Sequence, residues 1–275
     1  MKEINIDVRN FKEKFEEGLE SIIYYYFDSN YYLDDVLYKR FRSVEYIRNY
    51  NNDISPDMLK NKYEKILMIS SLNCLKDEVK LLDVGFEKDK FSGYTMKKSS
   101  LKPLKAAHKI LDDGSYQLTY HKSNGLSLTF KDKINYLKLL REKIEKLNNM
   151  DVYIGDFNYE NFLVSNNMDK IVLCDLDNLK MWSHDFDNKT ASVKKYEEAC
   201  MNTNNNTNID GLDSFCFNIF TLSLILNQSN FTTLRHIDEL KLPKELDNFE
   251  NNEILDSMKH LDKTYKPRYI IDKFR

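Results

Sequence analysis

The stretch 154–177 constrains the fold of this chain more than any other. It begins with a polar loop that carries Asp156 and Asn161, and it continues with a short apolar run, the polar turn 166–169 and a second apolar run that ends at Asp175. Two short apolar runs joined by a polar turn predict a β-hairpin. Because a hairpin returns the chain to its own open end, we expect Asn161 and Asp175 to emerge side by side, with Asp156 just upstream.

These three polar residues indicate one kind of chemistry. The amide oxygen of Asn161 and the carboxylate of Asp175 are oxygen ligands of the kind that Mg²⁺ prefers. A further carboxylate, that of Asp156, suits the orientation of an attacking hydroxyl group. Phosphoryl transfer from a nucleotide requires both a metal ion and an oriented nucleophile. The stretch therefore predicts a magnesium-dependent phosphoryl-transfer site.

The same stretch resembles the catalytic loop and the metal-binding loop of the protein-kinase superfamily, whose signatures are H-R-D-x-x-x-x-N and D-F-G. The resemblance implies that Asp156 is the catalytic aspartate and that Asn161 and Asp175 bind the Mg²⁺ ion that accompanies ATP. The match is partial, because Gly155 replaces the arginine and Asp177 replaces the glycine of these signatures.

Motifs upstream follow in the order expected of this family. Lys39 lies in a β-prone run that resembles the V-A-I-K strand, whose lysine pairs with the nucleotide phosphates. Gly18 and Ser21 belong to a run similar to a degraded glycine-rich loop. The run 62–72 is amphipathic at helical spacing. The resemblance implies that Glu64, in this run, pairs with Lys39.

Two strand-like runs, 79–86 and 91–96, come next. The residues at the end of the second run resemble the start of the hinge between the two kinase lobes. The resemblance therefore implies that Met96 and Lys97 contribute to nucleotide binding.

Two helices are expected further along the chain. The run 129–148 carries an apolar stripe at helical spacing and starts at Thr129, a suitable N-cap. The run that starts at Asp213 is apolar on all sides, which predicts a buried helix. It resembles the D-x-W-S-x-G-V segment of the kinase family, which implies that Asp213 accepts hydrogen bonds from the backbone of the catalytic loop.

The fold expected from these motifs is α+β, a bilobal protein-kinase-like architecture. Residues 1–96 would form a small antiparallel sheet with one main helix, and residues 97–275 a larger, mainly helical lobe. Within the second lobe, we expect 101–124 to be rich in loops with an irregular helical region. We expect 183–209 to be the equivalent of an activation segment, and the chain after Asn227 to be helical.

Composition excludes several classes of protein. A mean hydropathy of -0.61, with no apolar run near the roughly 18 residues that span a bilayer, predicts a soluble protein without a membrane partner. A net charge of -3 argues against a nucleic-acid partner. The four cysteines lack the spacing of a metal site, and the N-terminus lacks the apolar core of a secretory signal, so we expect a cytoplasmic location.

The resemblance implies an ATP-dependent Ser/Thr protein kinase that uses Mg²⁺ and transfers phosphate to a hydroxyl group of a protein or a small molecule. Two alternatives stay open. The loop at Gly18 has a single glycine, which is unfavourable for ATP affinity and consistent with a pseudokinase that acts as a binding module. Gly155 and Asp177 instead favour a small-molecule kinase similar to aminoglycoside or choline phosphotransferases, whereas the helix at Asp213 favours a protein kinase.

Overall fold

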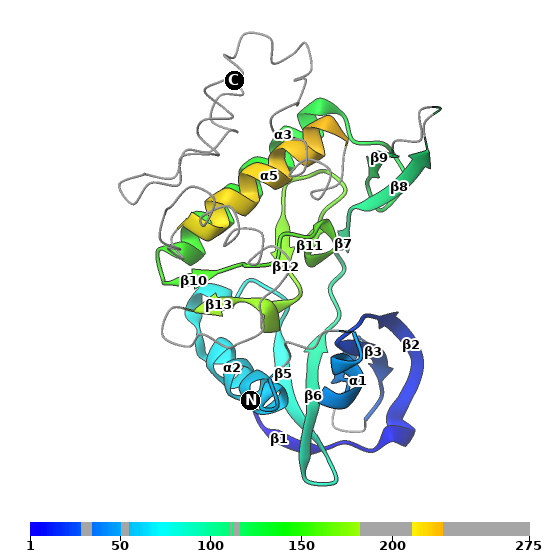
Figure 1. The fold of residues 1–275 in the computed structure, drawn as a ribbon, viewed down its shortest axis with the longest axis vertical. Helices are drawn as coiled ribbons and strands as arrows, with labels where there is room; N and C mark the ends of the chain where they lie inside the picture. Colours follow the sequence, from blue (N-terminus) through cyan, green and yellow to red (C-terminus); the bar gives the residue numbers. More distant parts are fainter. Residues whose placement is uncertain (29–34, 51–54, 111, 113–115, 182–210, 228–275) are drawn as a thin grey trace. The chain divides into compact units, whose positions relative to one another are not determined.

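The computed structural model describes residues 1–28, 35–50, 55–110, 112, 116–181 and 211–227 (Figure 1). These residues form an α+β structure with a multi-stranded, mostly antiparallel sheet, which confirms the expected fold class. The chain divides into two compact units. The first comprises the described residues of Met1–Ser100 together with Val172–Asp177; the second comprises those of Leu101–Ile171 together with 178–181 and 211–227.

A six-stranded sheet forms the framework of the first unit. In spatial order its strands are β1 (Glu3–Asn5), β5 (Leu81–Glu87), β6 (Lys90–Lys97), β4 (Val36–Phe41), β3 (Ser21–Tyr26) and β2 (Phe11–Glu17). All neighbouring strands are antiparallel except β1 and β5, which are parallel. The strands expected around Lys39 and over 79–86 and 91–96 are therefore confirmed.

Aromatic residues explain why the outer part of this sheet is stable. The rings of Phe11 and Tyr24 stack across β2 and β3 with their centroids 4.7 Å apart. Tyr26 and Tyr38 are buried in a cluster with Val36. Aromatic and β-branched pairs on facing strands stabilise a sheet beyond the area that they bury. The tyrosines described in β3 and β4 therefore serve packing.

Helix α2 (Met58–Ser71) packs against β5 and β6, and the short α1 (Val44–Arg48) precedes it. The buried positions of α2 recur every three or four residues, as expected of one helical face. They are Met58, Lys62, Lys65, Ile66 and Ile69. Two lysines thus lie on the inner face of this helix. This is unusual, because lysine is almost never fully buried unless it is paired.

Two helices form the core of the second unit. α3 (Phe130–Asn148) begins with a capping box in which Thr129 and Asp132 each accept a hydrogen bond from the other's backbone N–H, so the expected cap is confirmed. α5 (Leu212–Leu226) packs against α3, and all of its residues from 212 to 225 are buried, as expected. No helix in the described ranges is both long and apolar enough to cross a membrane.

Short strands complete the second unit. β7 (Lys102–Pro103) pairs with β11 (Phe162–Val164), and β10 (Val152–Tyr153) pairs with β13 (Lys180–Met181), in both cases antiparallel. After β11, the Ser165 N–H donates to the Lys170 carbonyl at 3.1 Å, which closes the expected turn before β12 (Ile171–Leu173).

The prediction of an irregular helical region within 101–124 was wrong. The described residues there form an antiparallel pair, β8 (Lys105–Ile110) and β9 (Tyr116–His121). The alternation of exposed and buried residues from Gln117 to Tyr120 fits a strand with one covered face. Asp112, which lies between the two strands in sequence, is in a turn. The expected activation segment and the expected helices after Asn227 lie outside the described residues.

Candidate functional site

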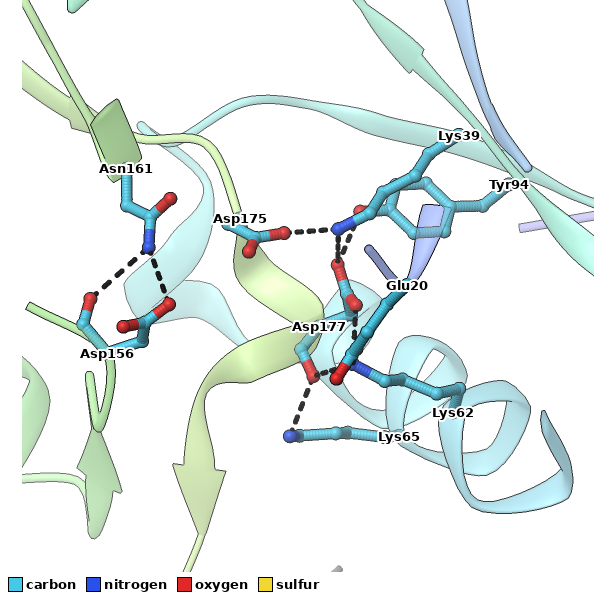
Figure 2. Close-up of polar contacts among 9 residues, drawn as sticks. All are labelled: Glu20, Lys39, Lys62, Lys65, Tyr94, Asp156, Asn161, Asp175 and Asp177. Carbon is cyan, nitrogen blue, oxygen red and sulfur yellow. Dashed lines mark hydrogen bonds and ion pairs between the residues drawn. The ribbon is translucent and has the colours of Figure 1, made fainter. Parts of the chain in front are cut away.

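Lys39 occupies a central position in the sheet of the first unit. It lies in β4, opposite Ile23 of β3 on one side and Tyr94 of β6 on the other, and its side chain is buried. Its ammonium group contacts the Asp175 carboxylate and donates to Asp177 Oδ1 at 2.6 Å (Figure 2). The structure therefore brings together Lys39 and Asp175, two residues selected from separate motifs.

Burial and the neighbouring charges shift the pKa values of this cluster in opposite directions. Burial alone would lower the pKa of Lys39, but the attraction of Asp175 and Asp177 outweighs it and raises that pKa well above its usual value. Burial raises the pKa of Asp175 to about 6, against the opposing effect of Lys39. Asp177 is held well below its usual pKa because the attraction of Lys39 and Lys62 exceeds the cost of burial.

Asp177 has several partners besides Lys39. Its Oδ1 also accepts a hydrogen bond from the Tyr94 hydroxyl at 2.8 Å, and its Oδ2 accepts one from Lys62 at 2.7 Å. Its backbone carbonyl accepts a hydrogen bond from Lys65 at 2.8 Å. The residue, in the middle of the short 3-10 helix Leu176–Asn178, is completely buried. Asp177 is therefore a structural anion at the centre of the cluster.

The expected pairing of Lys39 with Glu64 was wrong. Glu64 is exposed, and Lys39 forms its ion pairs in the first unit with Asp175 and Asp177. The reason is the rotation of α2: its inner face carries Lys62 and Lys65, and Glu64 lies between them in sequence, so it points outward.

The other residues expected at the nucleotide site have different environments. Gly18 is exposed in the turn between β2 and β3, where its N–H donates to the carbonyl of buried Ser21 at 2.9 Å. A side chain at Gly18 would meet the same carbonyl at 3.7 Å, an ordinary contact, so packing there does not require glycine. Met96 is buried in β6, and Lys97 at the end of this strand is exposed.

The second unit carries the other two polar residues of the resemblance. Asn161, in the short 3-10 helix Tyr159–Asn161, donates through Nδ2 to Asp156 Oδ2 at 3.0 Å and to the Asp156 carbonyl at 3.3 Å (Figure 2). This pair of hydrogen bonds defines the orientation of the amide, since both partners are acceptors. The Asn161 side-chain oxygen then faces away from Asp156, as a ligand would need.

Asp213 holds the loop that carries Asp156. Its carboxylate accepts hydrogen bonds from the Ile154 N–H at 2.9 and 3.0 Å and from the Gly155 N–H at 3.1 Å, which confirms the role expected for it. When the Asn148 amide is oriented to satisfy its neighbours, its nitrogen donates to Asp213 Oδ2 at 2.9 Å. Burial raises the pKa of Asp213 to about 7, although the backbone hydrogen bonds oppose this shift.

Gly155 adopts a backbone conformation that other residues avoid. Its φ angle is +68°, and a Cβ atom there would lie 2.9 Å from Lys180 Cγ. Both observations favour glycine at this position. Any larger side chain, such as the arginine of the H-R-D signature, would be strained and would displace Lys180.

The residues present suit Mg²⁺ by their chemistry. Asn161 and Asp175 supply an amide and a carboxylate oxygen, and magnesium typically uses one or two protein ligands together with phosphate oxygens and water. Within the described ranges, no group of three or more His, Cys, Asp or Glu side chains is placed to hold a metal ion.

Sequence reasoning missed Lys62, Lys65 and Tyr94 as partners of Asp177. A signal was present, because Lys62 and Lys65 share a helical face with the apolar residues Ile66 and Ile69. Lysines in register with an apolar stripe indicate a buried anion nearby.

No family model matches the chain, and no curated protein is significantly similar to it in sequence.

Proposed function

We propose that this chain is an ATP-dependent phosphotransferase with a bilobal protein-kinase-like fold, acting as a Ser/Thr protein kinase that uses Mg²⁺ and ATP. The observation that carries the proposal is the contact between Lys39 and Asp175. The two residues are 136 positions apart and belong to two separate motifs of the kinase resemblance. A basic residue for the phosphates beside an acidic residue for the metal is what this chemistry requires.

The proposed roles follow from the environment of each group. Lys39 neutralises the nucleotide phosphates, and its buried ion pairs keep it protonated. Asn161 and Asp175 bind Mg²⁺, which supplies charge neutralisation at the transferred phosphate. Asp156 accepts or orients the proton of the attacking hydroxyl group.

The loop of the second unit supports the role of Asp156. A catalytic carboxylate must be held in position by groups that do not themselves react. The Asp213 carboxylate fixes the backbone at Ile154 and Gly155, immediately before Asp156, and the Asn161 amide fixes the Asp156 side chain. Asp156 remains partly exposed, as a residue that meets a substrate must be.

Metal-dependent nucleotide binding is the first test. A ligand that binds only the native state raises the melting temperature by mass action. ATP should therefore raise the Tm of the wild type when Mg²⁺ is present and not when EDTA replaces it, and Asp175→Asn should abolish the shift. An equal shift in the wild type and in Asp175→Asn would reject Asp175 as a metal ligand.

Phosphate transfer is the second test. Asp156→Ala should leave Mg²⁺-ATP affinity nearly unchanged and lower transfer of labelled phosphate by about two orders of magnitude or more, because Asp156 acts mainly in the transition state. The acceptors are the protein itself and a generic basic protein. Binding without transfer in the wild type would favour the pseudokinase. Transfer that survives Asp156→Ala would assign the catalytic loop to other residues.

A small-molecule kinase is the second candidate, and Gly155 favours it. In many protein kinases the arginine at this position pairs with a phosphorylated activation loop, and Gly155 has no side chain that could form such a pair. Control by such a phosphorylation is therefore not expected here. Adding an aminoglycoside and choline as acceptors in the same transfer assay separates the two candidates, because only a small-molecule kinase would phosphorylate them in preference to protein.

A further inference from the structure

The inner face of α2 presents cations where the kinase resemblance implies an anion. Lys62 and Lys65 are both buried, and both donate to Asp177. We infer that Asp177 is the positioning residue of Lys39, and that Lys62 holds α2 to the same carboxylate. This inference rests on the proposed function, in which Lys39 binds the phosphates of a nucleotide.

The two oxygens of Asp177 have separate partners. Oδ1 accepts from Lys39 at 2.6 Å and from the Tyr94 hydroxyl at 2.8 Å, whereas Oδ2 accepts from Lys62 at 2.7 Å (Figure 2). One carboxylate therefore links β4, β6 and α2. Because charge-assisted hydrogen bonds are short and directional, this arrangement fixes the position of the Lys39 ammonium group.

Asp175 and Asp177 differ in the exposure of their side chains, and this difference gives them different roles. The Asp177 side chain is 0% exposed and its oxygens are occupied by protein donors, so it is not accessible to a metal ion. The Asp175 side chain is 22% exposed. Asp175 can therefore exchange its contact with Lys39 for a metal ion, while Asp177 keeps Lys39 in place.

Lys62 extends the link to the turn between β2 and β3. Its ammonium group lies 3.3 Å from a carboxylate oxygen of Glu20, in that turn. The turn contains Gly18, in the run that resembles a glycine-rich loop. Lys62 thus joins α2 both to Asp177 and to the turn, and the loss of Asp177 should disturb the phosphate site from two sides.

Nucleotide affinity tests the inference directly. Asp177→Asn keeps the shape of the side chain and removes its charge; it should weaken Mg²⁺-ATP binding by about tenfold or more, the usual effect of losing hydrogen bonds to a charged group. Asp177→Glu restores the charge and should recover part of the affinity. Glu64→Gln, on the same helix as Lys62, is the matched control and should bind like the wild type.

Double mutants test whether Lys62 and Asp177 act on nucleotide binding through the same contact. Lys62→Met should weaken binding on its own, but it should add less in the Asp177→Asn background than in the wild type, because the ion pair of Lys62 with Asp177 is already lost there. Tyr94→Phe removes one hydroxyl group and keeps the buried ring, so it should weaken binding a few-fold, as expected for one hydrogen bond. If Asp177→Asn does not fold, these two variants carry the test. The inference is overturned if Glu64→Gln weakens binding and they do not.

A measurement without nucleotide separates this inference from the proposed function. Acetylation of the intact protein by an activated ester, followed by mass spectrometry of peptides, reports how accessible the Lys39 amine is. Labelling of Lys39 should rise several-fold in Asp177→Asn, since its ion pair with Asp177 is lost, and should stay unchanged in Glu64→Gln. A wild type that binds no ATP but shows this labelling pattern would reject the function and retain the role of Asp177. Unchanged labelling in Asp177→Asn would reject that role.

Discussion

Asp177 in the first unit and Asp213 in the second are both aspartates with 0% exposure, yet their surroundings differ in kind. Asp177 accepts hydrogen bonds from the side chains of Lys39, Lys62 and Tyr94. Asp213 accepts hydrogen bonds from the backbone N–H groups of Ile154 and Gly155, and no lysine or arginine pairs with it among the described residues.

The two carboxylates consequently titrate in opposite directions. The pKa of Asp177 lies well below its usual value and that of Asp213 rises to about 7, although burial favours the neutral form of both. Cations at hydrogen-bonding distance outweigh burial at Asp177, whereas two backbone dipoles do not outweigh it at Asp213. The comparison shows that the charge of the partners, more than the number of hydrogen bonds, decides whether a buried carboxylate is ionised.

Replacing Asp177 should have the largest effect on stability. Asp177→Ala leaves Lys39 and Lys62 without their shared anion, and breaking a buried ion pair by removing one partner typically costs about 3–5 kcal/mol. Urea denaturation followed by circular dichroism measures the loss. A cost below about 1 kcal/mol would mean that water or another carboxylate replaces Asp177 easily, and the contrast with Asp213 would then fail.

Replacing Asp213 by asparagine should change how the stability of the protein depends on pH. Between its usual pKa near 3.8 and about 7, folded Asp213 keeps a proton that the unfolded chain has released. Wild-type stability therefore falls as pH rises through this range and levels off above it. Asparagine does not titrate, so the stability of Asp213→Asn relative to the wild type should increase by about 2–3 kcal/mol from pH 5 to pH 8.

Urea titrations of both proteins at several pH values measure this difference. Asp175→Asn does not serve as a control, because Asp175 lies in the ionic cluster. Asp132→Asn, in the capping box of α3, does, because the pKa of Asp132 is lowered and Asp132 stays ionised across this range. A constant difference between the wild type and Asp213→Asn across the range would show that the backbone N–H groups keep Asp213 ionised, like Asp177.

Replacing Gly155 should have a smaller effect on the same loop. Gly155→Ala places a Cβ atom in a left-handed backbone conformation and 2.9 Å from Cγ of the buried Lys180 side chain, which must shift. A destabilisation of about 1–2 kcal/mol is expected, mostly from backbone strain. A comparison of the Tm of Gly155→Ala with that of Gly125→Ala separates strain from crowding. At Gly125 φ is +86°, but a Cβ atom would have no other atom within 4 Å. Equal losses would exclude a contribution from Lys180.

Replacing Glu64 should change almost nothing. Glu64 is exposed on the outer face of α2, and exposed substitutions away from caps and ion pairs typically stay within about 0.5 kcal/mol. Glu64→Gln compared with Lys62→Gln in the same denaturation assay tests this assignment of the helix faces. A larger loss for Glu64→Gln would reverse the orientation of α2 and restore the expected pairing with Lys39.

The sequence predicted the elements better than the ionic pairings. Apolar runs of the right length and a suitable N-cap were sufficient for β4, β5, β6, α3 and α5. The resemblance also predicted that Asp213 accepts hydrogen bonds from the catalytic-loop backbone. In each case a local sequence pattern, or a motif at a fixed spacing, was sufficient to predict the element or the contact.

The pairing of Lys39 was not predictable in the same way. It depends on the rotation of α2 by a fraction of a turn, since Lys62, Glu64 and Lys65 are almost adjacent in sequence. The hydrophobic stripe of α2 includes Ile66 and Ile69, which place Lys62 and Lys65 on the inner face. Glu64 has the chemical type that the kinase motif calls for, but the periodicity of the buried residues places it on the outer face of the helix.

The first unit combines segments that are far apart in the sequence, and this affects how the chain folds during its synthesis. Its lysines are synthesised long before their anion, because 138 residues separate Lys39 from Asp177. A nascent chain that ends near residue 100 contains the sheet sequence and α2, but not Val172–Asp177, which belongs to the same unit. We expect such a chain to stay incompletely folded on the ribosome. Expressed alone, residues 1–100 should need a peptide that spans 172–177, supplied in trans, to become compact.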